Sequence, residues 1–124
     1  MAEQLVVFDS NLMLWQSHPT VPDLMLKIFE SRATGRGYDA VLVKVLTGNK
    51  IDWHSHAEAN ETIYVIQGVG EILGANGEQH QASAGPIKLA GGSVVTIPVA
   101  LRHAVFNTGS EPLLIFAFHS PATV

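Results

Sequence analysis

Apolar and polar residues alternate along most of the chain in short segments, and glycine-, asparagine- and proline-containing turns separate these segments. The segments are rich in β-branched and aromatic residues, and a period of two residues is typical of strands that bury one face. The strands predicted in this way cover residues 4–8, 24–30, 39–47, 61–67, 70–73, 93–98, 103–107 and 112–119. Many short strands joined by turns predict an all-β sandwich or barrel.

The sequence of residues 10–17 is compatible with a helix, and this segment can form either a short helix or an extended arm. Glycine and proline are spread along the chain, and no linker rich in proline or serine divides it. We therefore expect a single domain over residues 1–124, with residues 1–23 as an N-terminal arm or edge strand and residues 24–120 as the barrel.

Composition narrows the class of protein. Hydrophobic residues make up 47% of the chain and charged residues 15%, which excludes intrinsic disorder. The net charge of -4 and the scattered cations argue against nucleic acid as a partner. The absence of cysteine excludes disulfides, cysteine-ligated zinc and iron–sulfur clusters. Because no leader peptide and no membrane-spanning run is evident, we expect a cytoplasmic protein that does not bind membranes.

The histidine pair His54 and His56 is the first candidate for chemistry. In an extended chain, side chains two residues apart project to the same face, with Cα atoms about 6.6 Å apart. Glu61 follows after a loop over residues 57–60 and offers an oxygen ligand. A lone His-x-His is a weak signal, because most such histidines are surface or hydrogen-bonded residues.

Two longer segments strengthen this candidate. The segments GNKIDWHSHAEANETIYVIQG (48–68) and GSVVTIPVALRHAVFN (92–107) resemble the two characteristic motifs of the cupin superfamily. The resemblance implies an antiparallel double-stranded β-helix of the jelly-roll type and metal ligation by His54, His56, Glu61 and His103. The second motif usually has glycine where this chain has Ala100, two residues after Pro98. That difference puts in doubt a turn that needs a positive φ.

Three imidazoles and one carboxylate form a set of ligands that suits one divalent transition metal per chain. Iron, manganese, nickel, zinc and copper are all compatible with this set. Four protein ligands leave open positions when the metal is five- or six-coordinate. This favours a metal that activates dioxygen or chelates a substrate over a closed structural zinc site.

The strand period also suggests residues of a substrate pocket. Gln67 is predicted on the face of Glu61, and Asn107 on the face of His103. Arg102 precedes His103 and is a candidate for meeting an anionic ligand at the rim, while His119 lies in the last predicted strand as a further pocket candidate. Trp53 is predicted to face away from its neighbour His54.

The leading hypothesis for function is a small metal-dependent enzyme that acts on a small polar organic molecule able to chelate the metal. Oxidation by dioxygen is preferred to isomerase or lyase chemistry, because no second carboxylate or tyrosine is clearly predicted to point inward. The alternative is a non-catalytic module that binds or senses a small molecule.

A homodimer is expected for two reasons. The apolar segments 5–8 and 12–15 are suited to form an additional edge strand that protects an open sheet edge. The resemblance points the same way, because small cupins commonly pair through their sheets.

Overall fold

The computed structural model describes residues 4–19, 21, 23–76 and 81–124, with the side chains of 76 and 81–85 left aside. Regular structure in these residues consists of strands and two 3₁₀ turns, η1 (Ser10–Leu12) and η2 (Arg32–Thr34). The predicted all-β class is confirmed. No helix among the described residues has the length and apolar character that crossing a membrane requires.

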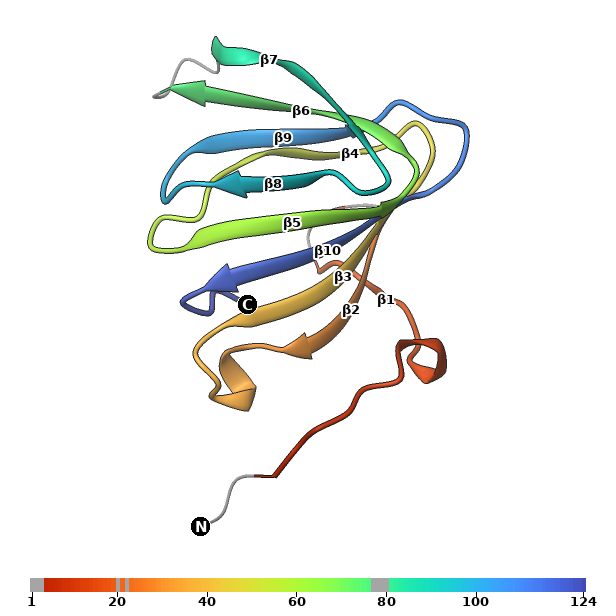
Figure 1. Cartoon of the computed structure of the whole chain (residues 1–124), viewed down its shortest axis with the longest axis vertical. Helices are drawn as coiled ribbons and strands as arrows, with labels where there is room; N and C mark the ends of the chain where they lie inside the picture. The colour runs from red at the N-terminus through yellow and green to blue at the C-terminus, as the bar shows by residue number, and fades with distance from the viewer. Residues whose placement is uncertain (1–3, 20, 22, 77–80) are drawn as a thin grey trace.

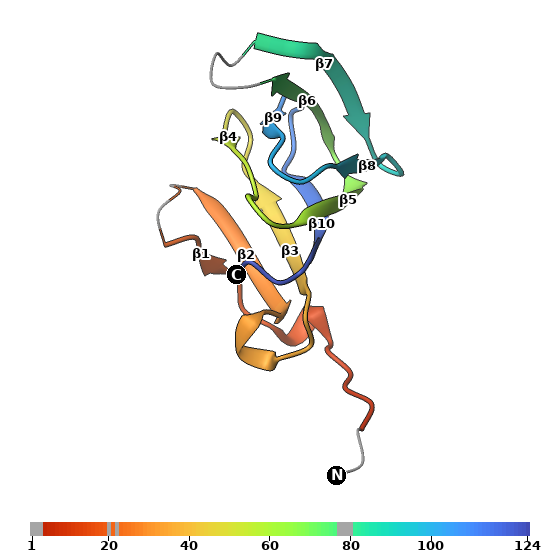
Figure 2. The same ribbon diagram turned by 90° about the vertical axis from the view of Figure 1, so that its left-hand side faces the viewer.

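The strands form two antiparallel sheets that face each other (Figure 1). The six-stranded sheet has the order β1 (Gln16–Ser17), β2 (Leu24–Glu30), β3 (Asp39–Val45), β10 (Leu113–Ser120), β5 (Asn60–Gln67) and β8 (Val94–Ile97). The four-stranded sheet has the order β4 (Lys50–His54), β9 (Arg102–Asn107), β6 (Val69–Asn76) and β7 (Gln81–Ala90). Strands distant in sequence are neighbours, as in a jelly roll, and the rotated view in Figure 2 shows the curvature of the two sheets.

The core lies between the two sheets, and alternation along the strands builds it. In β10, residues Leu113, Ile115 and Ala117 are buried while their neighbours are more exposed. Burial of such side chains contributes about 1.5–3 kcal/mol each to folding. The inward face of β5 begins with Glu61, and that of β10 continues to His119, so the strands that form the core also carry polar groups into it.

The N-terminal region lacks the strand that was predicted over residues 4–8. Residues 4–8 do not form a strand; they run as an extended arm (Figure 1), and the ring of Phe8 packs against Phe29 of β2. The segment 10–17 contains only the turn η1 and the two-residue strand β1, which pairs with the edge of β2. Two strands of the four-stranded sheet, β4 and β7, were absent from the predicted set.

Candidate metal centre

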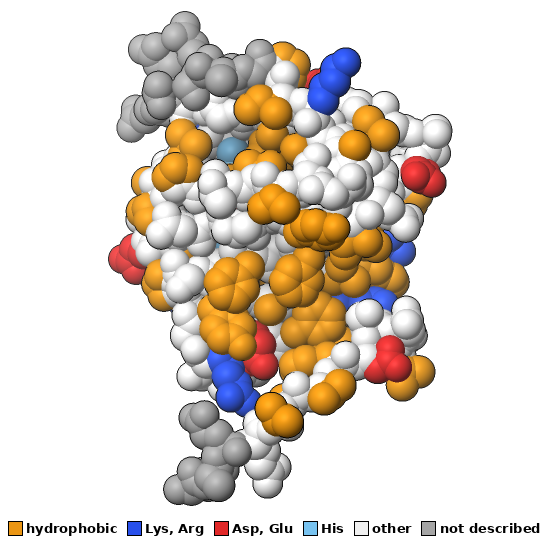
Figure 3. Space-filling view, viewed as in Figure 1, with side chains coloured by type: hydrophobic (Ala, Val, Ile, Leu, Met, Phe, Trp, Pro, Cys, Tyr) orange, Lys and Arg blue, Asp and Glu red, His pale blue; other side chains and the backbone are white. Residues whose placement is uncertain are grey.

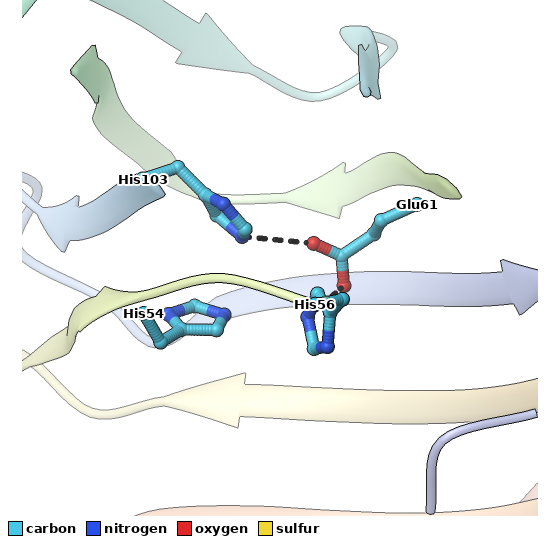
Figure 4. A group of neighbouring side chains, drawn as sticks. All are labelled: His54, His56, Glu61 and His103. Carbon is cyan, nitrogen blue, oxygen red and sulfur yellow. Dashed lines mark hydrogen bonds and ion pairs between the residues drawn. The ribbon is translucent and has the colours of Figure 1, made fainter. Parts of the chain in front are cut away.

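The four proposed ligands converge at one point between the sheets. His54 ends β4, His56 follows it, Glu61 lies near the start of β5 and His103 lies near the start of β9. Their ligand atoms all lie within 4.8 Å of one another. Figure 4 shows the four side chains pointing toward a common centre. These residues could hold a metal ion, and they line a cavity of about 390 Å³.

Backbone contacts set the positions of these side chains. His54 is the register partner of His103 across β4 and β9. The amide of Ala100 donates to the carbonyl of His56 over 2.9 Å, which links the two motif segments. Ala100 has φ of 65°, so the turn with positive φ is retained although alanine replaces the usual glycine. Left-handed backbone costs a non-glycine residue about 1–2 kcal/mol, so this turn is strained.

Two of the histidines are prepared for coordination through Nε2. His54 Nδ1 lies 2.8 Å from the carbonyl of Asp52, and His103 Nδ1 lies 2.9 Å from the carbonyl of Leu101. A carbonyl accepts only, so each Nδ1 carries the proton and donates it. In the neutral ring, Nε2 then keeps its lone pair, which is the arrangement typical of metal-binding histidines.

The remaining contacts test whether a cation fits here. His103 Nε2 lies 3.0 Å from Glu61 Oε1, at hydrogen-bonding distance, so a ring nitrogen and a carboxylate oxygen are held close together. His56 Nε2 is buried without a hydrogen-bond partner and lies 3.7 Å from Glu61 Oε2. A buried, unpartnered polar atom is costly. A divalent cation among these nitrogen and oxygen atoms would satisfy them together, so the residues fit a metal.

The protonation states suit the same role. Burial, opposed by the attraction of Glu61, lowers the pKa of His56 from 6.5 to about 4. Burial and the neighbouring His103 likewise lower the pKa of His54. Burial raises the pKa of Glu61, but hydrogen bonds with His103 and His119 outweigh it and hold this pKa well below its ordinary value. His54 and His56 are therefore neutral and Glu61 is ionised near neutral pH, the forms that bind metals.

His119 supports Glu61 from the side opposite His103. Its Nε2 forms a short hydrogen bond with Glu61 Oε2, and its Nδ1 lies 2.8 Å from Asp39 Oδ2. Burial lowers the pKa of His119, but Glu61 and then Asp39 outweigh it and raise this pKa. His119 is thus a cation between two carboxylates, and both its ring nitrogens are engaged. It holds Glu61 in place and leaves Oε1 directed toward His103.

Asp39 anchors this chain of contacts. It is fully buried, and its carboxylate accepts hydrogen bonds from the amide and the hydroxyl of Thr123, both over 2.8 Å, and from the amide of Val124. Burial raises the pKa of Asp39, but these bonds and His119 outweigh it and lower the pKa. No spacing in the sequence connects Asp39 with Glu61. His119 of β10 links the two carboxylates only because β10 pairs with both β3, which carries Asp39, and β5, which carries Glu61.

Of the four predicted pocket residues, the structure brings only His119 to the cavity. Gln67 is exposed and lies outside the cavity lining, so its predicted position on the Glu61 face is wrong. The reason is a register shift: Leu114 is paired with Gln67 but Ile115 with Val65. The additional residue of this bulge ends the regular alternation of β5 before Gln67.

Asn107 and Arg102 also lie outside the cavity lining. Asn107 is buried, and its amide nitrogen donates to the carbonyls of Val45 and Glu111, both over 2.9 Å. It therefore ties strand ends together. Arg102 is half-buried, and because it adjoins the inward-facing His103 in β9, it belongs to the opposite face.

The cavity wall is mainly aliphatic, and it includes residues that the sequence analysis missed. Val43, Ile63 and Ile115 are among the aliphatic side chains that form it, and His18 and Trp53 also line it. Trp53 was predicted to face away. A bulge in β4 between Ile51 and His54 breaks the period of two and brings Trp53 into the lining.

Comparison with known proteins agrees with this architecture. A family model described as Cupin domain matches residues 41–119, which is more than half of the chain. No curated protein matches the sequence.

Several solved structures share the fold. KdgF from Halomonas sp. superimposes with a TM-score of 0.74 at 23% identity, covering 95% of this chain and 96% of that one. The Cnp3 cupin domain of Schizosaccharomyces pombe gives 0.75 at 15% identity, covering 97% and 77%. A predicted oxalate decarboxylase from Thermotoga maritima gives 0.77 at 16% identity, covering 94% and 99%. These low identities establish the fold alone, and together with the family match they show that the chain belongs to the cupin family.

Proposed function

We propose that this chain is a metal-dependent enzyme that oxidises a small, polar, metal-chelating molecule with dioxygen. The observation that carries the proposal is the buried Nε2 of His56, which has no hydrogen-bond partner and adjoins Glu61 and two further histidines in the lining of a cavity. When bound there, a redox-active divalent metal supplies electron transfer to dioxygen and a positive centre for the substrate.

The charges around the site favour an anionic chelating group on the substrate. Glu61 and Asp39 are ionised, and His119 is held as a cation between them. The divalent cation therefore exceeds the remaining negative charge of this group by one unit. A carboxylate or enolate bound to the metal would remove this excess.

The aliphatic wall of the cavity determines which substrate size and polarity the site prefers. Side chains such as Val43, Ile63 and Ile115 offer no hydrogen bonds to a substrate, and the cavity of about 390 Å³ suits a small molecule. His119 has both ring nitrogens engaged, so in this arrangement it cannot accept a proton from a substrate. The His119 ring therefore offers no proton acceptor beside the metal ligands, which favours oxidation at the metal over isomerase or lyase chemistry.

A direct test is oxygen uptake by the protein loaded with Fe(II) and offered a panel of small carboxylates, diketones and thiols. We expect uptake with at least one chelating member. We also expect loss of uptake in Glu61→Ala even where some metal is retained. Glu58→Ala is the matched control, because Glu58 is an exposed glutamate in the loop that precedes Glu61.

The alternative, a non-catalytic module that binds or senses a small molecule, predicts a different outcome. In that case Fe(II)-, Mn(II)- and Ni(II)-loaded protein turns over no member of the panel, while one compound binds tightly and is recovered unchanged. That result would reject the enzyme and retain the metal site.

A further inference from the structure

The cavity that the metal ligands line continues across the inner face of the six-stranded sheet, where the strand register arranges its lining in rows. Glu61 and His119 are register partners in the row that carries the metal ligand. The next two rows contain only aliphatic lining residues, which are Ile63, Ala117 and Val41 in the first and Ile115, Val43 and Leu26 in the second. The lining therefore changes from polar to aliphatic within one row and stays aliphatic across β5, β10, β3 and β2.

The four-stranded sheet adds further aliphatic lining to the same cavity. Ile51 of β4 and Val105 of β9 are register partners, and both line it. Across the six-stranded sheet, β2 lies two strand spacings, about 10 Å, from β10, which carries His119. The aliphatic section is therefore long enough to hold several carbon atoms beyond a group bound at the metal ligands.

An aliphatic cavity of this size is unusual inside a folded domain. Protein interiors are close-packed and hold few voids larger than a water molecule, whereas this cavity measures about 390 Å³. Ordered water fills a void where about two to four polar groups bind it, and the aliphatic rows offer no such groups from their side chains. Ile63, Val43 and Ile115 are buried, so the protein itself excludes bulk water from them. The cavity is therefore suited to an apolar occupant.

We propose that the substrate is amphipathic: an anionic chelating group binds the metal, and an aliphatic chain of about three to six carbons lies along the aliphatic rows toward β2. This inference rests on the metal site of the proposed function and adds the class of substrate, an aliphatic monocarboxylate with a second oxygen donor beside its carboxylate. Val43 lies in the middle of the second row and Leu26 at its end, so these two residues set the length of chain that fits.

The charges of the lining disfavour a second ionic group at the far end of the chain. Among the described residues, no lysine or arginine lines the cavity, and its acidic side chains are Glu61 and Asp52. A second carboxylate would lie among aliphatic side chains with no cation to pair with, which is costly. The site should therefore prefer a monocarboxylate to a dicarboxylate of the same length.

The first test is isothermal titration calorimetry of the Zn(II)-loaded protein with straight-chain 2-oxo carboxylates, because zinc binds the chelating group without redox turnover. From 2-oxopropanoate to 2-oxohexanoate, the dissociation constant should fall about fourfold for each methylene that becomes buried. 2-Oxopentanoate should bind about tenfold or more tightly than 2-oxoglutarate, which has the same carbon chain and a second carboxylate. Equal affinities along the series, or tighter binding of 2-oxoglutarate, would overturn the inference.

Two variants should change the preferred chain length in opposite directions. Leu26→Ala enlarges the end of the aliphatic section, so the tightest binder should become a longer acid. Val43→Phe fills the middle of the section, so it should weaken binding of 2-oxohexanoate about tenfold and leave 2-oxopropanoate close to wild type. Zinc content and the circular dichroism spectrum show whether each variant keeps the site and the fold, and Leu26→Ala carries the test where Val43→Phe does not fold.

Leu42→Ala is the matched control for both variants. Leu42 adjoins Val43 in β3 but lines a hollow on the outer face of the sheet, where Figure 3 shows hydrophobic side chains gathered. Its variant should keep the wild-type order of affinities along the series. An unchanged order in Leu26→Ala and Val43→Phe as well would overturn the role of the aliphatic rows.

Binding to the zinc protein and oxygen uptake by the iron protein separate this inference from the proposed function. Affinity that rises with chain length, without oxygen uptake by any member, rejects the oxidation and supports the amphipathic ligand. Oxygen uptake that is equal for 2-oxopropanoate and 2-oxohexanoate supports the oxidation and rejects the aliphatic chain. Protein that holds one equivalent of zinc but binds no member of the series overturns the inference.

Discussion

His119 Nδ1 lies 2.8 Å from the carboxylate of Asp39, and both side chains are buried within the barrel. The other ring nitrogen of His119 meets Glu61, the only carboxylate among the four candidate ligands. The metal centre is therefore supported by a row of charges that runs from Glu61 through His119 to Asp39. Hydrogen bonds from Thr123 then fix Asp39.

This row predicts the effect of Asp39→Asn. The substitution leaves the His119 cation with one buried carboxylate instead of two, and losing one partner of a buried pair costs about 3–5 kcal/mol of unfolding free energy. Because His119 then holds Glu61 less firmly, metal affinity should fall about 10–100-fold. Urea denaturation and competition with a chelator measure the two effects.

Thr123→Val provides the comparison. It removes one hydroxyl hydrogen bond to the ionised Asp39, which should cost about 1.5–3 kcal/mol and leave metal affinity close to wild type. If Asp39→Asn lowers the free energy of unfolding but keeps full metal affinity, Asp39 only holds the C-terminal residues Thr123 and Val124 and does not position Glu61.

The stability of the metal-free protein should fall as pH decreases from 6.5 to 4. The pKa of His56 is about 4 in the folded protein and near 6.5 when unfolded, so the unfolded chain binds more protons in this window. The lowered pKa of Glu61 acts in the same direction at the acid end. The raised pKa of His119 acts oppositely: its contribution is complete below 6.5 and is lost as pH rises through its folded pKa.

Chemical denaturation at pH values between 4 and 7 measures this dependence. The variant His56→Gln removes the titrating group, so its stability should change less steeply between pH 6.5 and 4. An identical slope in the variant and the wild type would show that His56 is not the group responsible.

Ala100→Gly should stabilise the protein by about 1 kcal/mol. Ala100 has φ of 65°, and glycine adopts this region without the steric cost that alanine meets. Ala90→Gly is the control in an exposed strand position, where glycine should instead destabilise by about 0.5–1 kcal/mol. Thermal unfolding of both variants checks the signs, and a destabilised Ala100→Gly would contradict the strain.

Strands with regular alternation could be predicted well from the sequence. The predicted strand over residues 24–30 matches β2, and the predicted 61–67 lies within β5 (Asn60–Gln67). The arm shows the limit of the same signal. Residues 4–8 are rich in apolar and β-branched side chains like a strand, but within the described part of the chain no strand pairs with them, and strand pairing is not encoded locally.

The strand β7 was missed for the opposite reason. Its sequence QASAGPIKLA contains alanine, glycine and proline, which are poor strand formers, and tertiary pairing with β6 overrides this local preference.

The candidate site was predictable where local spacing determines it. His54, His56 and Glu61 lie close in sequence, and the motif resemblance added His103; the structure brings all four together. The predicted orientations of Gln67 and Trp53 were wrong because each lies at a β-bulge. The additional residue of a bulge moves the side chains that follow it to the other face of the sheet. Asp39 was missed because it reaches the site only through pairing across 80 residues.

The central claim, a metal held by His54, His56, Glu61 and His103, is tested most directly by elemental analysis of protein purified without a histidine tag and equilibrated with a divalent transition metal. The account predicts one equivalent of metal per chain in the wild type and in Glu58→Ala, and loss of stoichiometric metal in His56→Ala. A wild type without metal, or an unchanged metal content in His56→Ala, would contradict it.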